Sequence, residues 1–195
     1  MKRRVGILIS GRGTNMAALI EAARDPTYPA EVSLVISNRP EAPGLALARA
    51  AGISTVTIDH RPYGPDRAAH EAAIDAALRA ANVEIICLAG YMRVLTPFLV
   101  QRWAGRMLNI HPSLLPLFPG LDTHARALAA GVQQHGCTVH LVTDAVDEGE
   151  ILAQVAVPVL PNDTEQALAE RVLARENLLY PKALAAFIAR IEVTG

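Results

Sequence analysis

Short apolar runs alternate with helical patterns along the first half of this chain. Each strand-like run is rich in Val, Ile and Leu, and a stretch with apolar residues at helical spacing follows it. The predicted strands cover 3–10, 31–38, 54–59 and 83–90, and the predicted helices between them cover 16–24, 43–52 and 66–81. This alternation indicates a parallel sheet with helices on both faces.

The second half of the chain predicts three more strands. They cover 106–110, 135–144 and 150–159, with helices at 96–104, at 123–131 and from 162 to 179. Asp163 and Gln166 have the spacing of a capping pair for the last helix, and Pro181 is expected to break or kink it. We find no repeat, low-complexity tract or linker, so we expect one domain over 1–195. Its fold class is α/β: a doubly wound, mostly parallel sheet of about seven strands, related to the Rossmann fold.

The composition excludes several classes of protein. Hydrophobic residues make up 51% and charged residues 19%, which is typical of a packed globule, and the net charge of −1 gives no general attraction to nucleic acid or anionic membranes. Cys87 and Cys137 lack CxxC spacing and lie in apolar segments, so we expect reduced, buried thiols. The apolar run 5–9 is too short for a signal peptide, and no run is long enough to span a bilayer. We therefore expect a cytoplasmic protein.

Polar or glycine-rich segments follow four of the predicted strands. They are SGRGTN (10–15), AGYMRVL (89–95), NIHPSLLP (109–116) and TDAVDEG (143–149). In open parallel sheets, ligands bind outside the carboxyl ends of the strands. We therefore expect these four segments to meet at one site.

The segment SGRGTN places Gly11 and Gly13 between a strand and a helix. Glycines and a helix N-terminus together can bind a phosphate group. The segment lacks the Gly-Lys-Ser/Thr of a Walker loop, and Met16 stands where the dinucleotide fingerprint has its third glycine. Two interpretations stay open: a site for a lone phosphate, or a tight turn that needs glycine for its own geometry.

Asn109 and His111 are separated by one residue of an extended segment, so their side chains point the same way. An amide and an imidazole placed together can stabilise an oxygen that becomes negative, and the three prolines that follow would fix their geometry. The alternative is a capping amide and an ordinary loop histidine. If Asp144 or Asp147 faces His111, its charge would favour the imidazolium, although turn aspartates commonly bond only their own backbone.

Other polar residues carry weaker signals. A metal site at His111, Asp122 and His124 is conceivable, but three candidate ligands on one proline-rich loop are weak grounds, and we expect no metal. The loop 89–95 could form an apolar wall for a flat heteroaromatic ligand. Three arginines are candidate anion partners if they face the cleft: Arg67, Arg93 and Arg126.

Five segments taken together resemble one enzyme family. ISGRGTN, LAGYMRVL, LNIHPSLLPLFPGLDTH, HLVTDAVDEG and RENLLYP are similar, in order and spacing, to segments of the phosphoribosylglycinamide formyltransferases. NIHPSLLP alone would indicate only the wider formyltransferase family. Methionyl-tRNA formyltransferases and formyltetrahydrofolate deformylases carry further domains that 195 residues would not accommodate, which favours the first group.

The resemblance implies formyl transfer from 10-formyltetrahydrofolate to the amine of 5′-phosphoribosylglycinamide in de novo purine biosynthesis, without metal, by a monomer or homodimer. It assigns about 1–100 to the nucleotide and about 101–195 to folate and catalysis. By similarity, the catalytic residues are Asn109, His111 and Asp147. The ribonucleotide-binding residues are Gly11, Arg12, Gly13, Thr14, Asn15 and Glu176. The folate-binding residues are Arg67, Met92, Arg93, Val94, Leu95, Asn109, Thr143, Asp144, Ala145, Val146 and Asp147.

Two competing functions remain at this point. A hydrolase of the same donor would release formate without an amine acceptor, and a non-enzymatic module would bind a nucleotide at the glycine turn alone. Position 122 is Asp where some relatives carry His, so the resemblance provides no second imidazole there.

Overall fold

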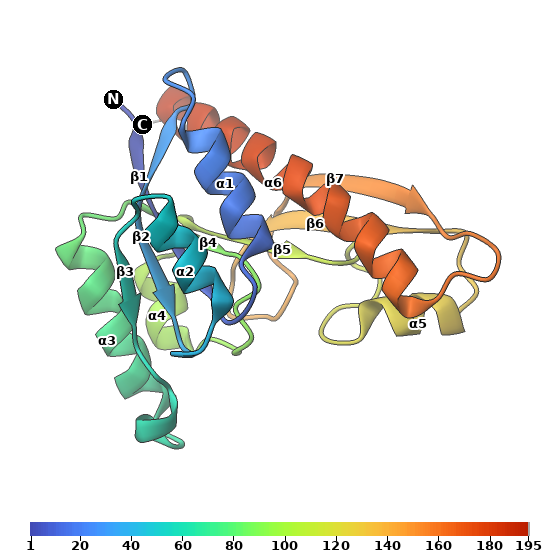
Figure 1. Cartoon of the computed structure of the whole chain (residues 1–195), viewed down its shortest axis with the longest axis horizontal. Coiled ribbons are helices and arrows are strands. Elements are labelled where there is room, and N and C mark those ends of the chain that lie inside the picture. The colour runs from blue at the N-terminus through green and yellow to red at the C-terminus, as the bar shows by residue number, and fades with distance from the viewer. Residues whose placement is uncertain (195) are drawn as a thin grey trace.

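A seven-stranded sheet forms the centre of the molecule in the computed structural model, which describes residues 1–194 (Figure 1). The strand order is β3-β2-β1-β4-β5-β6-β7, and the first five strands in this order are parallel. The strands are β1 (Arg3–Ile9), β2 (Ala30–Ser37), β3 (Thr55–Thr57), β4 (Ile85–Leu88), β5 (Met107–His111), β6 (Gln134–Leu141) and β7 (Ile151–Pro158). The predicted doubly wound, mostly parallel sheet is confirmed.

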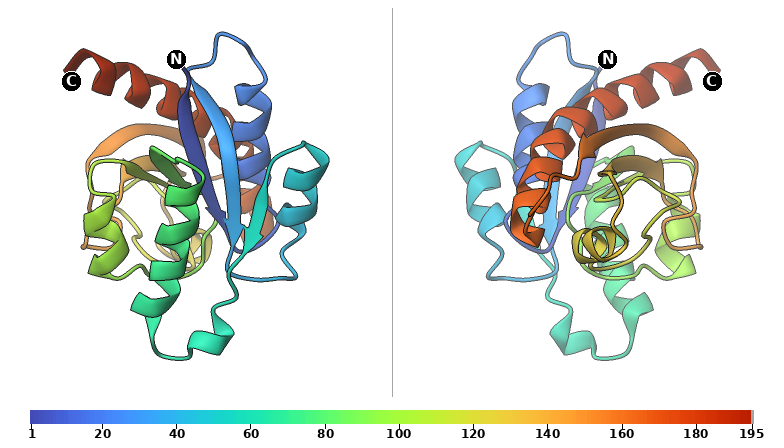
Figure 2. Two further views of the ribbon diagram at one scale, coloured as in Figure 1. Left: turned by 90° about the vertical axis from the view of Figure 1, so that its left-hand side faces the viewer. Right: turned by 90° about the vertical axis from the view of Figure 1, so that its right-hand side faces the viewer.

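Helices cover both faces of this sheet. Figure 2 shows α1 and α2 on one side of the strands and α3 and α4 on the other. The helices are α1 (Thr14–Ala23), α2 (Pro43–Ala50), α3 (Arg67–Ala80), α4 (Pro97–Arg102), α5 (Thr123–Ala129) and α6 (Glu165–Thr194), with a short 3-10 helix at Arg61–Tyr63. Within residues 1–194, no helix has the length and apolar character needed to cross a membrane.

The alternation of side chains along β1 separates two apolar layers. Val5, Ile7 and Ile9 pack with α1 and α6 on one face, and Leu8 packs with α3 and α4 on the other. A third apolar cluster, which includes Cys137, lies between β6, β7, α5 and α6. Cys87 and Cys137 are buried free thiols, as predicted, and burial raises the pKa of each to about 12.

The direction of the chain reverses between β5 and β6. These strands are antiparallel, so Leu141 at the end of β6 lies beside Leu108 near the start of β5. The loop that follows β6 therefore begins at the opposite edge of the sheet from the other three candidate segments, and the amide of Val142 donates to the carbonyl of Met107. Our expectation that all four segments start from the same edge was wrong for this one. The loop after β6 reaches the site by folding back along β5.

The last helix is longer than the sequence pattern predicts. α6 continues through Pro181 to Thr194, so the prediction of a break there was wrong. A proline inside a helix costs about 3 kcal/mol, but buried side chains on both sides of Pro181, including Tyr180 and Leu184, hold the helix against the sheet. Asp163 does not cap this helix. Thr164 Oγ1 accepts from the amide of Ala167, and Asp163 instead forms an ion pair with Arg171.

Candidate active site

A cavity of about 630 Å³ lies over the carboxyl edge of the sheet, where β1, β4 and β5 end. It brings together residues from the turn after β1, the loop after β4, strand β5 with its proline-rich loop, the loop after β6, and α6. The lining residues named by the sequence analysis are Asn15, Met92, Arg93, Val94, Leu95, Asn109, His111, Asp122, His124, Thr143, Asp144, Ala145, Val146, Asp147 and Glu176.

Asn109 and His111 share one face of β5, as their spacing predicts. Leu108 and Ile110 point to the opposite face, into the core beside α1 and α6. His111 Nε2 lies 3.0 Å from the carbonyl oxygen of Phe118, and Nδ1 lies 3.4 Å from Asp147 Oδ2. Both neighbours are hydrogen-bond acceptors. Each ring nitrogen of His111 therefore faces an acceptor, and the carboxylate of Asp147 lies beside the ring.

Asp147 is the carboxylate that faces His111, and its position depends on its backbone. Its φ is 57°, in the left-handed region that Asp tolerates better than most residues. Its Oδ2 also accepts from the amide of Gly120 at 2.8 Å, which ties the loop after β6 to the proline-rich loop. Asp144 lies elsewhere on the same loop, where Gln101 Nε2 donates to it at 3.2 Å. The geometry therefore selects Asp147 between the two aspartates that the sequence left open.

His140 is a site residue that sequence reasoning missed. It stands opposite Asn109 on β6, and its Nε2 lies 3.2 Å from Asn109 Nδ2 and 3.6 Å from Asp147 Oδ1. Its Nδ1 lies 2.9 Å from the carbonyl of Leu141, so Nδ1 carries the proton and Nε2 can accept from Asn109. Burial lowers the pKa of His140, which keeps the ring neutral and able to accept. Asn109 lies opposite His140 because of the register of β5 against β6, and local sequence does not reveal that register.

The proline-rich loop is fixed by bonds to β6 and β7 as well as by its prolines. Thr138 Oγ1 donates to the carbonyl of Ser113 and accepts from the amide of Leu115, and Gln154 Nε2 donates to the carbonyl of Leu115. Thr123 Oγ1 donates to the carbonyl of Pro112 at the other end of the loop. The loop that carries the catalytic candidates is therefore held on both sides, which supports the predicted rigidity.

Asn15 and Glu176 form the second polar part of the cavity. Asn15 Nδ2 donates to Glu176 Oε2 at 2.7 Å, and both side chains are buried. Asn15 Oδ1 has no hydrogen-bond partner among the described residues, so a donor on a ligand could occupy it. Burial raises the pKa of Glu176, and the bond from Asn15 opposes this shift.

The geometry of the turn before Asn15 supports the need for glycine and leaves the phosphate site as a prediction. Gly13 has φ +75° and a Cβ there would meet Gly44 Cα and Met16 Cε at 3.0 Å, so the turn needs glycine for its own geometry. Gly11 has open space around its Cα. Within residues 1–194, no side chain caps the N-terminus of α1, so its first amides are available to an anion.

Some candidates lie outside the cavity lining. In the described part of the chain, Gly11, Arg12, Gly13, Thr14 and Arg67 do not line it, and neither does Arg126. Arg67 instead donates from Nη1 to the carbonyl of Val94 at 3.3 Å, behind the 90–95 wall. Arg126 donates to the carbonyls of Pro119 and Leu121 and so stabilises the proline-rich loop. Besides His140, the lining residues that the sequence did not single out include Leu88, Val100, Thr123 and Glu165.

The metal site considered from the sequence finds no geometric support. Across residues 1–194, the structure contains no group of three or more His, Cys, Asp or Glu side chains arranged to hold a metal ion. His124 instead pairs with His135, with Nδ1 and Nε2 3.2 Å apart. Burial lowers the pKa of both rings, that of His135 to about 4.

Comparison with known proteins places this site in a family. The family model described as formyl transferase matches residues 3–184. The chain is 47% identical over 189 residues to the trifunctional purine biosynthetic protein adenosine-3 of Drosophila melanogaster, an alignment that covers 96% of this chain but 14% of that protein. It is 41% identical over 181 residues to phosphoribosylglycinamide formyltransferase of Escherichia coli, with 93% and 85% covered.

A solved structure gives the same result. The crystal structure of phosphoribosylglycinamide formyltransferase from Brucella melitensis matches with a TM-score of 0.91 and 57% identity, and the match covers 96% of each chain. The relationship that the five sequence segments predict is therefore confirmed, and this chain belongs to the formyl transferase family.

Proposed function

We propose that the protein transfers the formyl group of 10-formyltetrahydrofolate to the amine of 5′-phosphoribosylglycinamide, in de novo purine biosynthesis. The observation that carries this proposal is the arrangement of Asn109, His111 and Asp147 in one cavity with the Asn15–Glu176 pair. The family implies a folate-derived formyl donor, and the names of the E. coli and B. melitensis relatives supply the acceptor.

The glycinamide end of the ribonucleotide and the formyl donor fit two parts of the cavity, and the phosphate fits the N-terminus of α1 outside the cavity lining. The uncapped N-terminus of α1, reached through the turn 11–14, suits the phosphate of the ribonucleotide, and Asn15 with Glu176 suits its glycinamide end. The loop 90–95 and the loop 143–147 both line the cavity, and together they suit the flat pterin of the donor. The reacting carbon would then lie between the two parts, beside β5.

The chemistry follows from the groups that surround that point. The neutral amine attacks the formyl carbon, and the carbonyl oxygen becomes negative. An Asn109 N–H can donate to this oxyanion, and His111 supplies a second donor when one of its ring N–H groups turns from Phe118 or Asp147 to the substrate; each such donor is worth about 3–4 kcal/mol. As the new C–N bond forms and the bond from the formyl carbon to N10 of the folate breaks, the proton lost by the amine passes to N10. Asp147 Oδ2 lies 3.4 Å from His111 Nδ1, so Asp147 orients the ring, and its carboxylate can relay this proton.

A direct assay tests the proposal. The protein is mixed with 10-formyltetrahydrofolate and 5′-phosphoribosylglycinamide, and the tetrahydrofolate and the formylated ribonucleotide are quantified. Transfer that requires both substrates is the expected result. Formate release that is independent of the amine would identify a hydrolase instead. His111→Ala should lower kcat about 10²- to 10³-fold, and an unchanged kcat would remove His111 from the mechanism. A wild-type protein that binds the ribonucleotide without any turnover would be only a nucleotide-binding module.

A further inference from the structure

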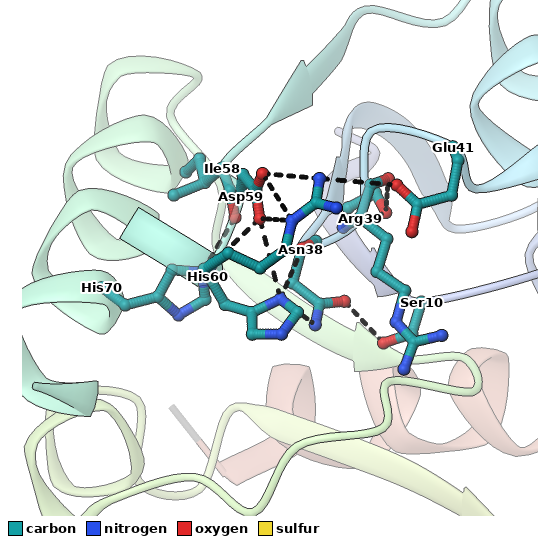
Figure 3. A network of polar contacts seen from close by, with 10 residues as sticks. Ser10, Asn38, Arg39, Glu41, Ile58, Asp59, His60 and His70 are labelled. Atoms are coloured by element: carbon teal, nitrogen blue, oxygen red, sulfur yellow. Dashed lines mark hydrogen bonds and ion pairs between the residues drawn. The ribbon is translucent and has the colours of Figure 1, made fainter. Parts of the chain in front are cut away.

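Side chains at the carboxyl ends of four neighbouring strands form one continuous row of hydrogen bonds. In sheet order β3-β2-β1-β4, the row runs from His60 after β3 to Asn38 after β2, then to Ser10 after β1 and to Met92 after β4. Figure 3 shows the side chains of His60, Asn38 and Ser10 along this row. The row crosses strands that are far apart in sequence and ends in the wall of the cavity.

The polarity of each bond in the row is determined by its partners. His60 Nδ1 donates to the backbone carbonyl of Asn38 at 2.9 Å, because that carbonyl can only accept. Ser10 Oγ donates its proton to Asn38 Oδ1 at 2.6 Å and accepts from the amide of Met92 at 2.8 Å. Ser10 and Asn38 are 4% and 2% exposed, so these bonds are shielded from water and reinforce one another.

The segment held by Ser10 is packed only in part. Tyr91 and Leu95 pack against the apolar cluster beside α3 and α4, whereas Met92 and Val94 are 59% and 57% exposed, so their side chains do not fix the backbone of the 90–95 wall. Hydrogen bonds hold this backbone at both ends. At one end Ser10 bonds to both Met92 and Gly90, through Oγ and through its backbone amide, and at the other end Thr96 donates from its amide and its hydroxyl to the buried carboxylate of Glu71.

We infer that Ser10 and Asn38 are positioning residues for the donor-binding wall, and that they act through the Met92 amide without contacting the donor. The inference rests on the proposed function, since it assigns the 90–95 wall to the formyl donor. Ser10 directly precedes Gly11, so the same residue joins the turn assigned to the ribonucleotide with the wall assigned to the donor. Removing its hydroxyl should release the wall while the catalytic groups on β5 stay in place.

The test compares Ser10→Ala with Ser33→Ala. Ser33 lies on β2 and its hydroxyl donates to the carbonyl of Val5 at 3.2 Å, so the control removes the same atom from the same sheet away from the wall. We expect Ser10→Ala to raise KM for 10-formyltetrahydrofolate about fivefold, which corresponds to the loss of about 1 kcal/mol, with kcat changed less than about twofold. Ser33→Ala should leave both constants unchanged. Asn38→Ala should raise the same KM, and it serves as the second variant if Ser10→Ala fails to fold.

Hydrogen exchange supplies a readout that does not depend on activity. Amides in the 90–96 segment should exchange faster in Ser10→Ala than in the wild type, and not in Ser33→Ala. A wild-type protein that turns over both substrates while Ser10→Ala keeps its KM and its exchange rates would overturn the inference. An equal rise in KM from Ser33→Ala would also overturn it. A wild-type protein without turnover would refute the proposed function alone, and the exchange comparison would still decide whether Ser10 holds the wall.

Discussion

Replacing Glu176 by Gln should make the protein more stable and less active at neutral pH. Glu176 is 7% exposed and accepts a hydrogen bond from Asn15. Gln is nearly the same size and its carbonyl can still accept from Asn15, so the change removes the charge with little disturbance of packing. The variant therefore separates the cost of burying this carboxylate from its use in binding.

The sign of the stability effect follows from the pKa. Burial raises the pKa of Glu176 above its ordinary value of about 4.5, so between that value and the raised one the folded protein holds a proton that the unfolded chain has lost. The carboxyl group therefore destabilises the fold increasingly as the pH rises above about 4.5. Each unit of the shift corresponds to about 1.4 kcal/mol, or about 3–6 °C in Tm for a domain of this size. At pH 4 the acid is neutral in both states and the difference should vanish.

The binding effect has the opposite direction. A hydrogen bond to a charged group is worth about 1.5–3 kcal/mol, so KM for 5′-phosphoribosylglycinamide should rise about 10- to 150-fold. Thermal unfolding at pH 4 and pH 7.5, together with steady-state kinetics, measures both effects. Glu170→Gln on the same helix is the matched control, since this residue is exposed. A Glu176→Gln protein with no gain in Tm at pH 7.5, or with an unchanged KM for the ribonucleotide, would refute this account of the site.

Three further predictions concern other residues. Asp147→Asn should keep the bond from the Gly120 amide but lose the carboxylate beside His111, so kcat should fall about 10²-fold; a kcat equal to that of the wild type would contradict this. His135→Gln should remove about 1.4 kcal/mol per pH unit of acid sensitivity between pH 6.5 and 4, because the buried ring stays neutral down to a pKa of about 4 while the unfolded ring takes up a proton; urea unfolding at pH 7 and pH 5 measures the difference. Tyr180→Phe should lower Tm by about 2–4 °C, since the hydroxyl donates to the carbonyls of Leu88 and Leu108 in the core, and calorimetry that finds no change would show that these bonds add nothing.

Local sequence patterns predicted the parts of this protein that depend on local physics. Apolar, β-rich runs located all seven strands, and in the central parallel strands β1 and β4 the run is continuous because both faces are buried. The alternation of Asn109 and His111 about Ile110 fixed their common direction, because side chains alternate along any strand. The family assignment depended on five motifs whose order and spacing along the whole chain match those of the family.

Pairings between distant segments could not be predicted in this way. Nothing local distinguishes His140 from other strand histidines, because its role arises from the register of β6 against β5. Pro181 was expected to break or kink the last helix, and the burial of Tyr180 and Leu184 against the sheet explains why α6 continues past it. Asp144 and Asp147 look alike in the sequence, and the left-handed backbone at position 147 separates them.

Because β6 runs antiparallel to β5, the carboxylate of Asp147 is held in the site differently from Asn109 and His111. Asn109 and His111 lie on strand β5, so they can move only with the sheet. Asp147 lies in a loop whose two ends, Leu141 and Ile151, are held together at the opposite edge of the sheet. How far Asp147 extends toward His111 therefore depends on the number of residues in that loop. Adding or deleting one residue between 142 and 150 should move the Asp147 carboxylate away from His111 and leave the sheet unchanged. This loop is therefore the place where kcat could be adjusted without a change of fold.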